Sequence, residues 1–340
     1  MNAERFQAIT QSYPGLRIGV LGDFCLDRYF EIDPARQETS LETGLPVHNV
    51  VNVRAQPGGA GTIVNNLVAL GIGTIFPIGF AGEDGEGFEL WRALEKQPGV
   101  RLDYFVKTVQ RRTFTYCKPL LLASGKPPVE LNRLDLKNWT PTPLVVQELL
   151  IGRFQEVAPK LNCAVVLNQV DIPETGVVTG KVLEAVKNEM DAHPEFLVLA
   201  DSRRGLRGFP PVVFKMNAVE LSALTGGASE LTLEQVKKAA AKVARKNGRS
   251  VFVTLAEGGI LGASALGEVQ HVTALPVRGE IDVVGAGDAV SANLTAAIAG
   301  GATLHEAIEL ANAAASVVIH KLGTTGTASV AEIANVMPPD

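Results

Sequence analysis

Residues 281–290, IDVVGAGDAV, place two glycines and an aspartate where an apolar strand-like run gives way to an Ala-rich helical one. Glycine permits tight turns, and the start of a helix presents backbone N–H groups with partial positive charge. Gly285, Ala286 and Gly287 therefore predict a cradle for an anion such as phosphate. Asp288 would repel that anion unless it has a task, such as accepting the proton of an attacking hydroxyl. The alternative is that Asp288 only caps the helix.

Two other phosphate motifs fit the glycine loop less well. A dinucleotide-binding loop needs a third glycine where this chain has Val290, followed by a βαβ unit with an acidic ribose ligand, which is not evident here. A Walker loop needs four residues between its glycines and then Lys with Ser or Thr. The pattern indicates an anion site that contains a carboxylate, as a kinase requires.

The elements that must position this loop alternate between apolar strands and helices. Helical patterns cover residues 142–157, 174–189 and 232–248, and the last opens with the capping-box spacing of Thr232 and Gln235. Alternation of this kind predicts a mostly parallel sheet covered by helices on both faces. The predicted strands read RIGVLGD, TIFPIGF, CAVVLN, FLVLAD and SVFVTLA.

Two segments interrupt the alternation. Residues 29–56 are polar and end in the strand-like PVHNVVNVRAQ, and residues 111–133 contain TFTYCKPLLLASGKPPVELNR, which reads as a hairpin. Short strands inserted among core strands are candidates for a lid over a binding site, and ordinary surface excursions are the alternative.

Composition limits the class of partner. The 340 residues are 46% hydrophobic and carry a net charge of −5 without a basic block, so we expect a small-molecule partner and no nucleic acid. No apolar run approaches a membrane span, and the first residues lack the apolar core of a signal peptide, so we expect no membrane partner and a cytoplasmic location. Cys25, Cys117 and Cys163 lie far apart, which speaks against a zinc or dithiol site and fits a reducing compartment.

The run DVVGAGDAVSANL resembles the carboxy-terminal signature of the ribokinase, or PfkB, family of carbohydrate kinases, and the resemblance extends over nearly the whole chain. PGGAGTIVNNLVALG with GFAGEDGEG resembles the amino-terminal signature, NAVE the N-x-x-E motif, and VTLAEGGI the nucleotide-side strand and turn. The resemblance implies a ribokinase-like three-layer α/β fold, with a mostly parallel sheet flanked by helices and a small β lid. It implies one kinase domain over residues 1–340, with a lid formed by about 29–56 and 111–133.

Within this family, the chain is similar to the kinase domain that phosphorylates heptose 7-phosphate in lipopolysaccharide precursor synthesis. The stretches GDFCLDRYF, PGGAGTIVNNLVALG, ELNRLD and ANAAASVVIHKLGTTG carry that likeness. The resemblance implies an ATP- and Mg²⁺-dependent carbohydrate kinase that phosphorylates a hydroxyl of a sugar or sugar phosphate. A nucleoside kinase on the same fold and a non-catalytic sugar or nucleotide sensor are the alternatives.

The resemblance assigns catalytic and acceptor-side residues. Asp288 is implied as catalytic base, and the amides of Gly285, Ala286 and Gly287 as the anion hole. Asp27 matches the residue that binds sugar hydroxyls, although it could instead pair with Arg28 or cap a turn. Further implied acceptor contacts are Gly58 and Gly59, a turn against which the sugar packs, and the arginines near the lid, Arg36, Arg112 and Arg133, which suit a substrate phosphate or simply solubilise the surface.

On the nucleotide side, Asn217 and Glu220 would orient the water shell of Mg²⁺, and Lys215 would contact the transferred phosphate; a solvated helix face is the alternative for the first two. Asn312 would approach the adenine, although packing of an Ala-rich helix explains its neighbours equally well. Asp282 with the loop around Gly323 resembles a monovalent-cation site, which leaves a K⁺ requirement open. The residues implied to border ATP are Thr254, Glu257 and Gly258.

Three departures from the family pattern concern the acceptor and the anion site. Val283 replaces the signature threonine, Thr62 and Ile63 stand where related kinases place a sugar-binding asparagine, and Asn168 with Gln169 replaces a Ser-Asp pair. The choice between sugar and sugar phosphate therefore stays open. Because exposed lid strands leave unpaired edges, we also expect a homodimer formed through the lid.

Overall fold

An eight-stranded sheet forms the centre of the computed structural model, which describes residues 1–123, 125, 128–227 and 230–337. Neighbouring strands from β6 to β15 run parallel, and the last two strands are antiparallel. In spatial order the strands are β17 (Val269–Val272), β16 (Ile260–Ala263), β15 (Val251–Thr254), β14 (Val213–Asn217), β13 (Leu197–Ser202), β12 (Cys163–Asn168), β1 (Arg17–Gly22) and β6 (Thr74–Ile78).

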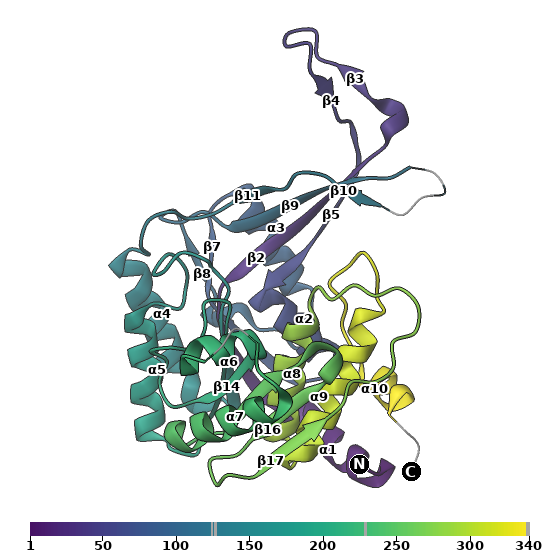
Figure 1. Cartoon of the computed structure of the whole chain (residues 1–340). Helices are drawn as coiled ribbons and strands as arrows, with labels where there is room; N and C mark the ends of the chain where they lie inside the picture. Colours follow the sequence, from purple (N-terminus) through teal and green to yellow (C-terminus); the bar gives the residue numbers. More distant parts are fainter. Residues whose placement is uncertain (124, 126–127, 228–229, 338–340) are drawn as a thin grey trace.

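Helices cover both faces of this sheet (Figure 1), so the predicted three-layer α/β fold is confirmed. Side chains of β1 alternate between the two apolar layers: Ile18 and Val20 lie in one buried cluster and Leu21 in the other. The first layer is built with α1 (Ala3–Thr10), α2 (Ala60–Ala69), α3 (Gly85–Glu95), α8 (Ala286–Ala299), α9 (Leu304–Ile319) and α10 (Val330–Val336). The second is built with α4 (Leu144–Val157), α5 (Gly180–Ala192), α6 (Ala218–Thr225) and α7 (Leu233–Asn247).

Local signals explain where the predicted helices begin and end. Thr232 and Gln235 form the predicted capping box of α7, and Gly248 ends the helix in a left-handed conformation. The prediction for residues 174–189 was wrong at its start, because the Thr179 side chain accepts the N–H of Val182 and makes Thr179 the N-cap of α5. The apolar pattern also did not predict β14, a short strand that holds Lys215.

A second sheet stands above the first and contains the segments that the sequence suggests as a lid, so we call it the lid. Its order is β10 (Val129–Glu130), β9 (Phe114–Leu121), β2 (Phe24–Ile32) and β5 (Val50–Gly59), and β11 (Leu134–Leu136) also pairs with β9. The predicted hairpin is confirmed by antiparallel β9 and β10, although residues 124, 126 and 127 of its connection lie outside the described residues. The strands reach beyond the expected limits, because β2 starts directly after β1 and β5 runs on to α2.

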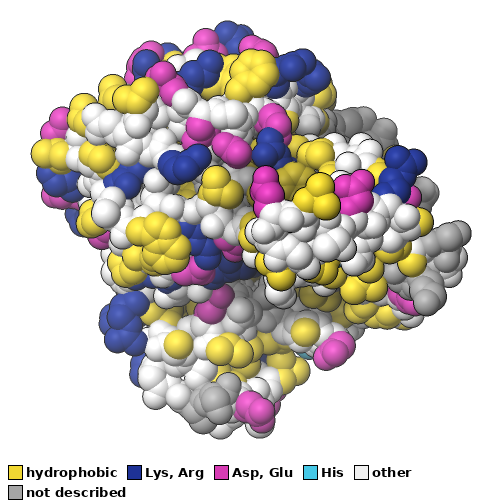
Figure 2. All heavy atoms as spheres, turned by 90° about the horizontal axis from the view of Figure 1, so that it is seen from above, with side chains coloured by type: hydrophobic (Ala, Val, Ile, Leu, Met, Phe, Trp, Pro, Cys, Tyr) yellow, Lys and Arg dark blue, Asp and Glu magenta, His cyan; other side chains and the backbone are white. Residues whose placement is uncertain are grey.

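A hairpin of β3 (Glu38–Thr39) and β4 (Pro46–Val47) projects from the tip of the lid (Figure 1). We call residues 33–49 the arm. Leu41 and Leu45 near its turn are 103% and 64% exposed, so most of the surface of both side chains faces solvent. Figure 2, seen from above, shows hydrophobic side chains among charged ones on this face.

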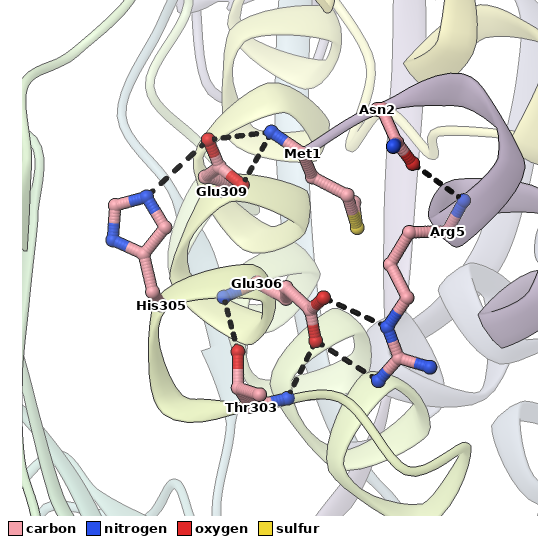
Figure 3. A network of polar contacts seen from close by, with 7 residues as sticks. All are labelled: Met1, Asn2, Arg5, Thr303, His305, Glu306 and Glu309. Atoms are coloured by element: carbon pink, nitrogen blue, oxygen red, sulfur yellow. Dashed lines mark hydrogen bonds and ion pairs between the residues drawn. The ribbon is translucent and has the colours of Figure 1, made fainter.

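A charged network fastens α1 to α9 (Figure 3). Arg5 donates from Nε to Oε1 of Glu306 at 2.7 Å and from Nη2 to Oε2 at 3.0 Å. Glu306 also accepts the N–H of Thr303 at 2.8 Å and completes the capping box of α9. A minor parallel pair of strands, β7 (Phe80–Gly82) and β8 (Val106–Thr108), lies beside the main sheet, and β7 contacts α3 and β2. Among the described residues, none of the helices has the length and apolar character needed to cross a membrane.

Candidate active site

The glycine loop lies at the start of α8, as predicted, and α8 packs against α2. Gly285 is the N-cap with a φ of 84°, a conformation that glycine adopts readily and other residues resist. A β-carbon at this position would also lie 2.5 Å from Cγ2 of Thr325. The N–H of Ala286 donates to the carbonyl of Val283 at 3.2 Å. Because the first turn of a helix leaves backbone N–H groups without intrahelical partners, the amides of Gly285 and Gly287 can hold an anion at the positive end of α8.

Asp288 lies in the first turn of α8 with a half-buried side chain. Burial raises the pKa of Asp288 to about 7, and the charges of Asp201 and Asp27 add to this rise, whereas Lys215 and Arg203 oppose it. In the part of the chain that the structure describes, its carboxylate has no hydrogen-bond partner, so the helix cap considered as an alternative is not observed. A carboxylate that titrates near neutral pH suits a general base.

Lys215 lies beside the glycine loop in a buried contact with a carboxylate. Its Nζ donates to Oδ2 of Asp201 at 2.7 Å, and the two residues are only 7% and 8% exposed. The hydroxyl of Ser291 donates to the same Oδ2 at 2.9 Å. A β-carbon at Gly287 would lie 3.1 Å from the Lys215 Nζ, so the ammonium borders the anion cradle. Lys215 and Gly287 were predicted site residues, whereas Asp201 and Ser291 were not.

The acceptor-side residues Asp27, Gly58 and Gly59 come together where the lid meets the sheet. Asp27 is 8% exposed on β2, and a β-carbon at Gly58 would lie 2.7 Å from its carboxyl carbon. Gly59, with a φ of 56°, is the N-cap of α2. Burial raises the pKa of Asp27, which the charges of Lys118 and Arg133 counteract. The charge of Asp27 in turn raises the pKa of Asp288, so the two carboxylates lie close enough for their charges to interact.

The alternative pairing of Asp27 with Arg28 does not occur. The guanidinium of Arg28 instead contacts Glu86, at 3.4 Å, and Glu89. Both acids lie on α3, so Arg28 ties the lid strand β2 to that helix. The carboxylate of Asp27 is therefore not neutralised by Arg28.

The loop after β12 borders the same place through Asp23, which sequence reasoning missed. The buried Asp23 carboxylate accepts the N–H groups of Gln169 at 2.8 Å, Val170 at 3.1 Å and Val177 at 2.6 Å. It thereby holds residues 168–177 against the turn at Gly59. The buried Oδ1 of Asn168 has no hydrogen-bond partner among the described residues.

The three candidate arginines are separated in the structure. Arg36 lies on the arm, 71% exposed, and pairs with Asp33 at 3.3 Å. Arg112 has an exposed side chain, and its backbone is held by Asn138. Only Arg133 is linked to the site, because its charge lowers the pKa of Asp27. Of the three arginines named from the sequence, Arg133 is thus the one whose charge acts on Asp27, and a role of Arg36 or Arg112 at a substrate phosphate stays a prediction.

Lys118 and Arg203 are cations near the site that the sequence did not single out. Lys118 of β9 lies 3.4 Å from the hydroxyl of Tyr29 and acts on the pKa of Asp27. Arg203 follows β13 and acts on the pKa of Asp288. A usable signal exists for Asp201, since it is a polar residue at the carboxyl end of an apolar strand, where ligands of parallel sheets bind.

Asn217 and Glu220 form the capping box of α6. Oδ1 of Asn217 accepts the Glu220 N–H at 2.8 Å, and Oε2 of Glu220 accepts the Asn217 N–H at 2.7 Å. Burial raises the pKa of Glu220, with a contribution from Asp201 and an opposing one from Lys215. The predicted metal-side pair is thus both a helix cap and a neighbour of the Lys215 site.

The predicted nucleotide-side residues lie at the end of β15, in the turn that follows it, and on α9. Thr254 ends β15, and Glu257 and Gly258 form the following 3₁₀ turn (Ala256–Gly258). Asn312 is buried on α9, where its Nδ2 donates to the carbonyl of Thr273 at 2.6 Å. Its amide therefore anchors the loop that leads from β17 to the glycine loop.

The candidate cation residue Asp282 starts the last turn before α8. Its N–H donates to the carbonyl of Ile319 at 2.8 Å, and its Oδ1 accepts the N–H of Val284 at 3.0 Å. Gly323 in the neighbouring loop has a φ of 67°. These contacts hold the entry of the glycine loop against the end of α9.

Comparison with known proteins accounts for this arrangement. A profile described as pfkB family carbohydrate kinase matches residues 24–331, which includes the lid strands and the glycine loop. The chain belongs to the pfkB family of carbohydrate kinases. Members of this family phosphorylate a hydroxyl of a sugar or sugar phosphate with ATP, and the chain is accordingly a carbohydrate kinase.

Curated relatives in this family are longer than the chain. It is 30% identical to the "Bifunctional protein HldE" of Azorhizobium caulinodans over 308 residues, which are 90% of the chain and 61% of that protein. It is also 30% identical to the protein of the same name from Hyphomonas neptunium, covering 97% of the chain and 65% of the relative. The chain thus spans less than two thirds of the length of these relatives.

Solved structures of the same fold include ribokinase and phosphofructokinase-2. Arabidopsis thaliana ribokinase complexed with ribose and ATP aligns with a TM-score of 0.68 at 22% identity, over 96% of this chain and 99% of that one. Phosphofructokinase-2 from Escherichia coli in complex with potassium aligns with a TM-score of 0.73 at 19% identity, over 95% and 98%. At these identities the likeness supports the ribokinase-like fold alone.

Proposed function

We propose that this carbohydrate kinase transfers the γ-phosphoryl group of Mg·ATP to a hydroxyl of a phosphorylated sugar. The observation that carries the proposal is that Asp288, at the positive end of α8, lies near enough to Asp27 for the charge of Asp27 to raise its pKa. Asp27 would accept hydroxyls of the sugar, and Asp288 would take the proton of the reacting hydroxyl. The hydroxyl oxygen then forms a bond to the γ-phosphorus as the bond to the bridging oxygen of ADP breaks.

The groups around the transferred phosphoryl favour its negative charge. The amides of Gly285 and Gly287 and the Lys215 ammonium would stabilise charge on the phosphoryl oxygens. Glu220 retains a second carboxylate oxygen beyond the one that caps α6, so it can also orient water on Mg²⁺. Bound Mg²⁺ would neutralise charge on the ATP phosphates.

Two cations on the lid support a phosphorylated acceptor. Lys118 and Arg133 both act on the pKa of Asp27; Lys118 lies on β9, and Arg133 lies between β10 and β11. A neutral sugar needs no cation beside its hydroxyls, whereas a sugar phosphate gains from two. Because the chain resembles heptose 7-phosphate kinases and is similar to proteins named HldE, heptose 7-phosphate is the first acceptor to test.

The experiment measures ADP release from Mg·ATP with hexoses, pentoses, heptoses, their phosphates and nucleosides, beside the Asp288→Asn variant. Turnover with a sugar phosphate that is lost in Asp288→Asn supports the proposal. Preference for an unphosphorylated sugar or a nucleoside would contradict the acceptor class. Binding of ATP and sugar without ADP formation would favour a sensor.

The proposal extends to location, K⁺ and assembly. Three buried free cysteines and the use of ATP suit the cytoplasm. Asp282 is the residue at which a K⁺ dependence would arise.

We also propose a homodimer through the lid, because β5 is the edge strand of its sheet and Val51 and Val53 on it are 48% and 49% exposed.

A further inference from the structure

We propose that Asp201 is a positioning residue for phosphoryl transfer: it holds the ammonium of Lys215 at the anion cradle, and Ser291 fixes its carboxylate. The inference rests on the proposed kinase function, because it concerns how that site is kept in order. Asp201 lies outside every sequence motif of the chain that pointed to the kinase.

The contact joins three elements that are distant in the sequence. Lys215 on β14 and Ser291 on α8 donate to the same Oδ2 of Asp201 on β13, at 2.7 and 2.9 Å. All three side chains are buried, with 7%, 0% and 8% exposure for Lys215, Ser291 and Asp201. The ammonium of lysine is carried on a flexible four-carbon stem, so a fixed partner is needed to hold it in one place.

Charge explains why the partner must be a carboxylate. The buried Lys215 ammonium lies 2.7 Å from Oδ2 of Asp201, so the carboxylate compensates its charge directly. Removing one member of a buried ion pair leaves the other uncompensated. Without Asp201, the Lys215 ammonium would therefore be expected to leave its position at the cradle.

Its position distinguishes this pair from one that only supports the fold. The Lys215 Nζ lies 3.1 Å from where a β-carbon of Gly287 would be, directly before Asp288. Ser291 follows Gly287 by one helical turn, and its hydroxyl also lies 3.2 Å from the Gly287 carbonyl. Asp201 therefore contacts two residues that border the cradle, Lys215 and Ser291.

The test compares Asp201→Asn with native enzyme in Mg·ATP binding by calorimetry and in kcat and KM for both substrates. Loss of a transition-state donor typically costs about 10²–10³ in kcat, so a displaced Lys215 should lower kcat by about 10- to 100-fold. ATP should bind about tenfold more weakly, while KM for the acceptor changes little. Glu306→Gln is the control, because it breaks a charge pair on the α1 side of the fold and should leave kcat unchanged.

A double-mutant cycle with Lys215→Met separates positioning from other effects. If Asp201 acts through Lys215, adding Asp201→Asn to Lys215→Met should lower kcat less than about twofold further. Ser291→Ala keeps the ion pair and should lower kcat by about three- to tenfold. This variant replaces Asp201→Asn in the test if Asp201→Asn does not fold. Folded Asp201→Asn, or folded Ser291→Ala in its place, with native ATP affinity and native kcat would overturn the inference.

The measurement of ATP binding by calorimetry also tests this inference separately from the proposed function. If no acceptor is turned over by native enzyme, the acceptor proposal fails, and ATP affinity still reports on Asp201. Unchanged ATP affinity in Asp201→Asn then counts against the inference, and weakened affinity supports it. If Asp288→Asn abolishes turnover but Asp201→Asn does not lower it, the kinase proposal stands and the inference fails.

Discussion

Gly58 packs so closely on Asp27 that a β-carbon on the glycine would lie 2.7 Å from the carboxyl carbon of the aspartate. Backbone and side chain come from β5 and β2, which pair antiparallel with Asp27 opposite Gln56. The absence of a side chain at residue 58 therefore sets the position of the carboxylate that we expect to bind the acceptor.

Gly58→Ala should raise KM for the acceptor by about tenfold or more, because the added methyl pushes the Asp27 carboxylate away. KM for ATP should stay near the native value. Steady-state kinetics measure both constants. Gly15→Ala is the control, since no atom lies within 4 Å of a β-carbon at that position. Equal acceptor KM in Gly58→Ala and native enzyme would remove Asp27 from the acceptor site.

The pH dependence of kcat/KM should show an acidic limb with a pKa of about 7, the value to which burial and the charge of Asp201 raise Asp288. Protonation below that pH removes the base. Asp288→Asn should lower kcat by about 10²–10⁴-fold at pH 8. An acid limb that persists unchanged in the residual activity of this variant would mean that another group titrates.

The charged form of Asp288, which activity needs, should lower the stability of the folded chain. Its pKa is higher in the folded chain than the ordinary 3.8, so the folded state loses stability as pH rises from about 4 to about 7. Asp288→Asn removes this cost. Urea unfolding should therefore find the variant more stable than native protein at pH 8, with the difference vanishing near pH 4. A less stable variant at pH 8 would contradict the assigned pKa.

Glu306 should contribute to acid sensitivity. Its hydrogen bond with Arg5 lowers the pKa of Glu306 to about 2, so the contribution is complete above the ordinary pKa of 4.5 and is lost as pH falls toward 2. Glu306→Gln keeps a residue that can complete a capping box and removes only the charge. We expect a loss of about 1 kcal/mol at pH 7, discounted because Arg5 is partly exposed, and a smaller one at pH 3. Urea titrations at both pH values measure it, and an equal loss at both would exclude the ion pair as its cause.

The lid dimer predicts that replacing Val51 and Val53 with serine yields a monomer in light scattering, since their exposed apolar surface would no longer be buried by a second copy. Leu266→Ser alters a 97% exposed leucine in the turn between β16 and β17 and should leave the assembly unchanged. A native protein that scatters as a monomer would refute the dimer.

Much of the site followed from the sequence because its signals are local. A glycine pair before an Ala-rich helix is enough to predict the anion cradle and Asp288, and the capping box of α7 is a matter of residue spacing. Alternating apolar strands and helices likewise determined the three-layer fold, since a parallel sheet must be covered on both faces. The start of α5 was missed because a threonine cap competes with the helical pattern.

Only the tertiary structure decided which distant side chains meet. Asp201 and Lys215 are separated by the crossover from β13 to β14, and Ser291 reaches them from α8, so their contact depends on strand order and helix packing. The same holds for Arg36 and Arg133. The pairing of β2 with β5 and β9 places Arg36 on the arm and places Arg133 where its charge acts on the pKa of Asp27. Residue spacing specifies turns, caps and faces, whereas the meeting of charges across strands is set by the register and burial of the whole sheet.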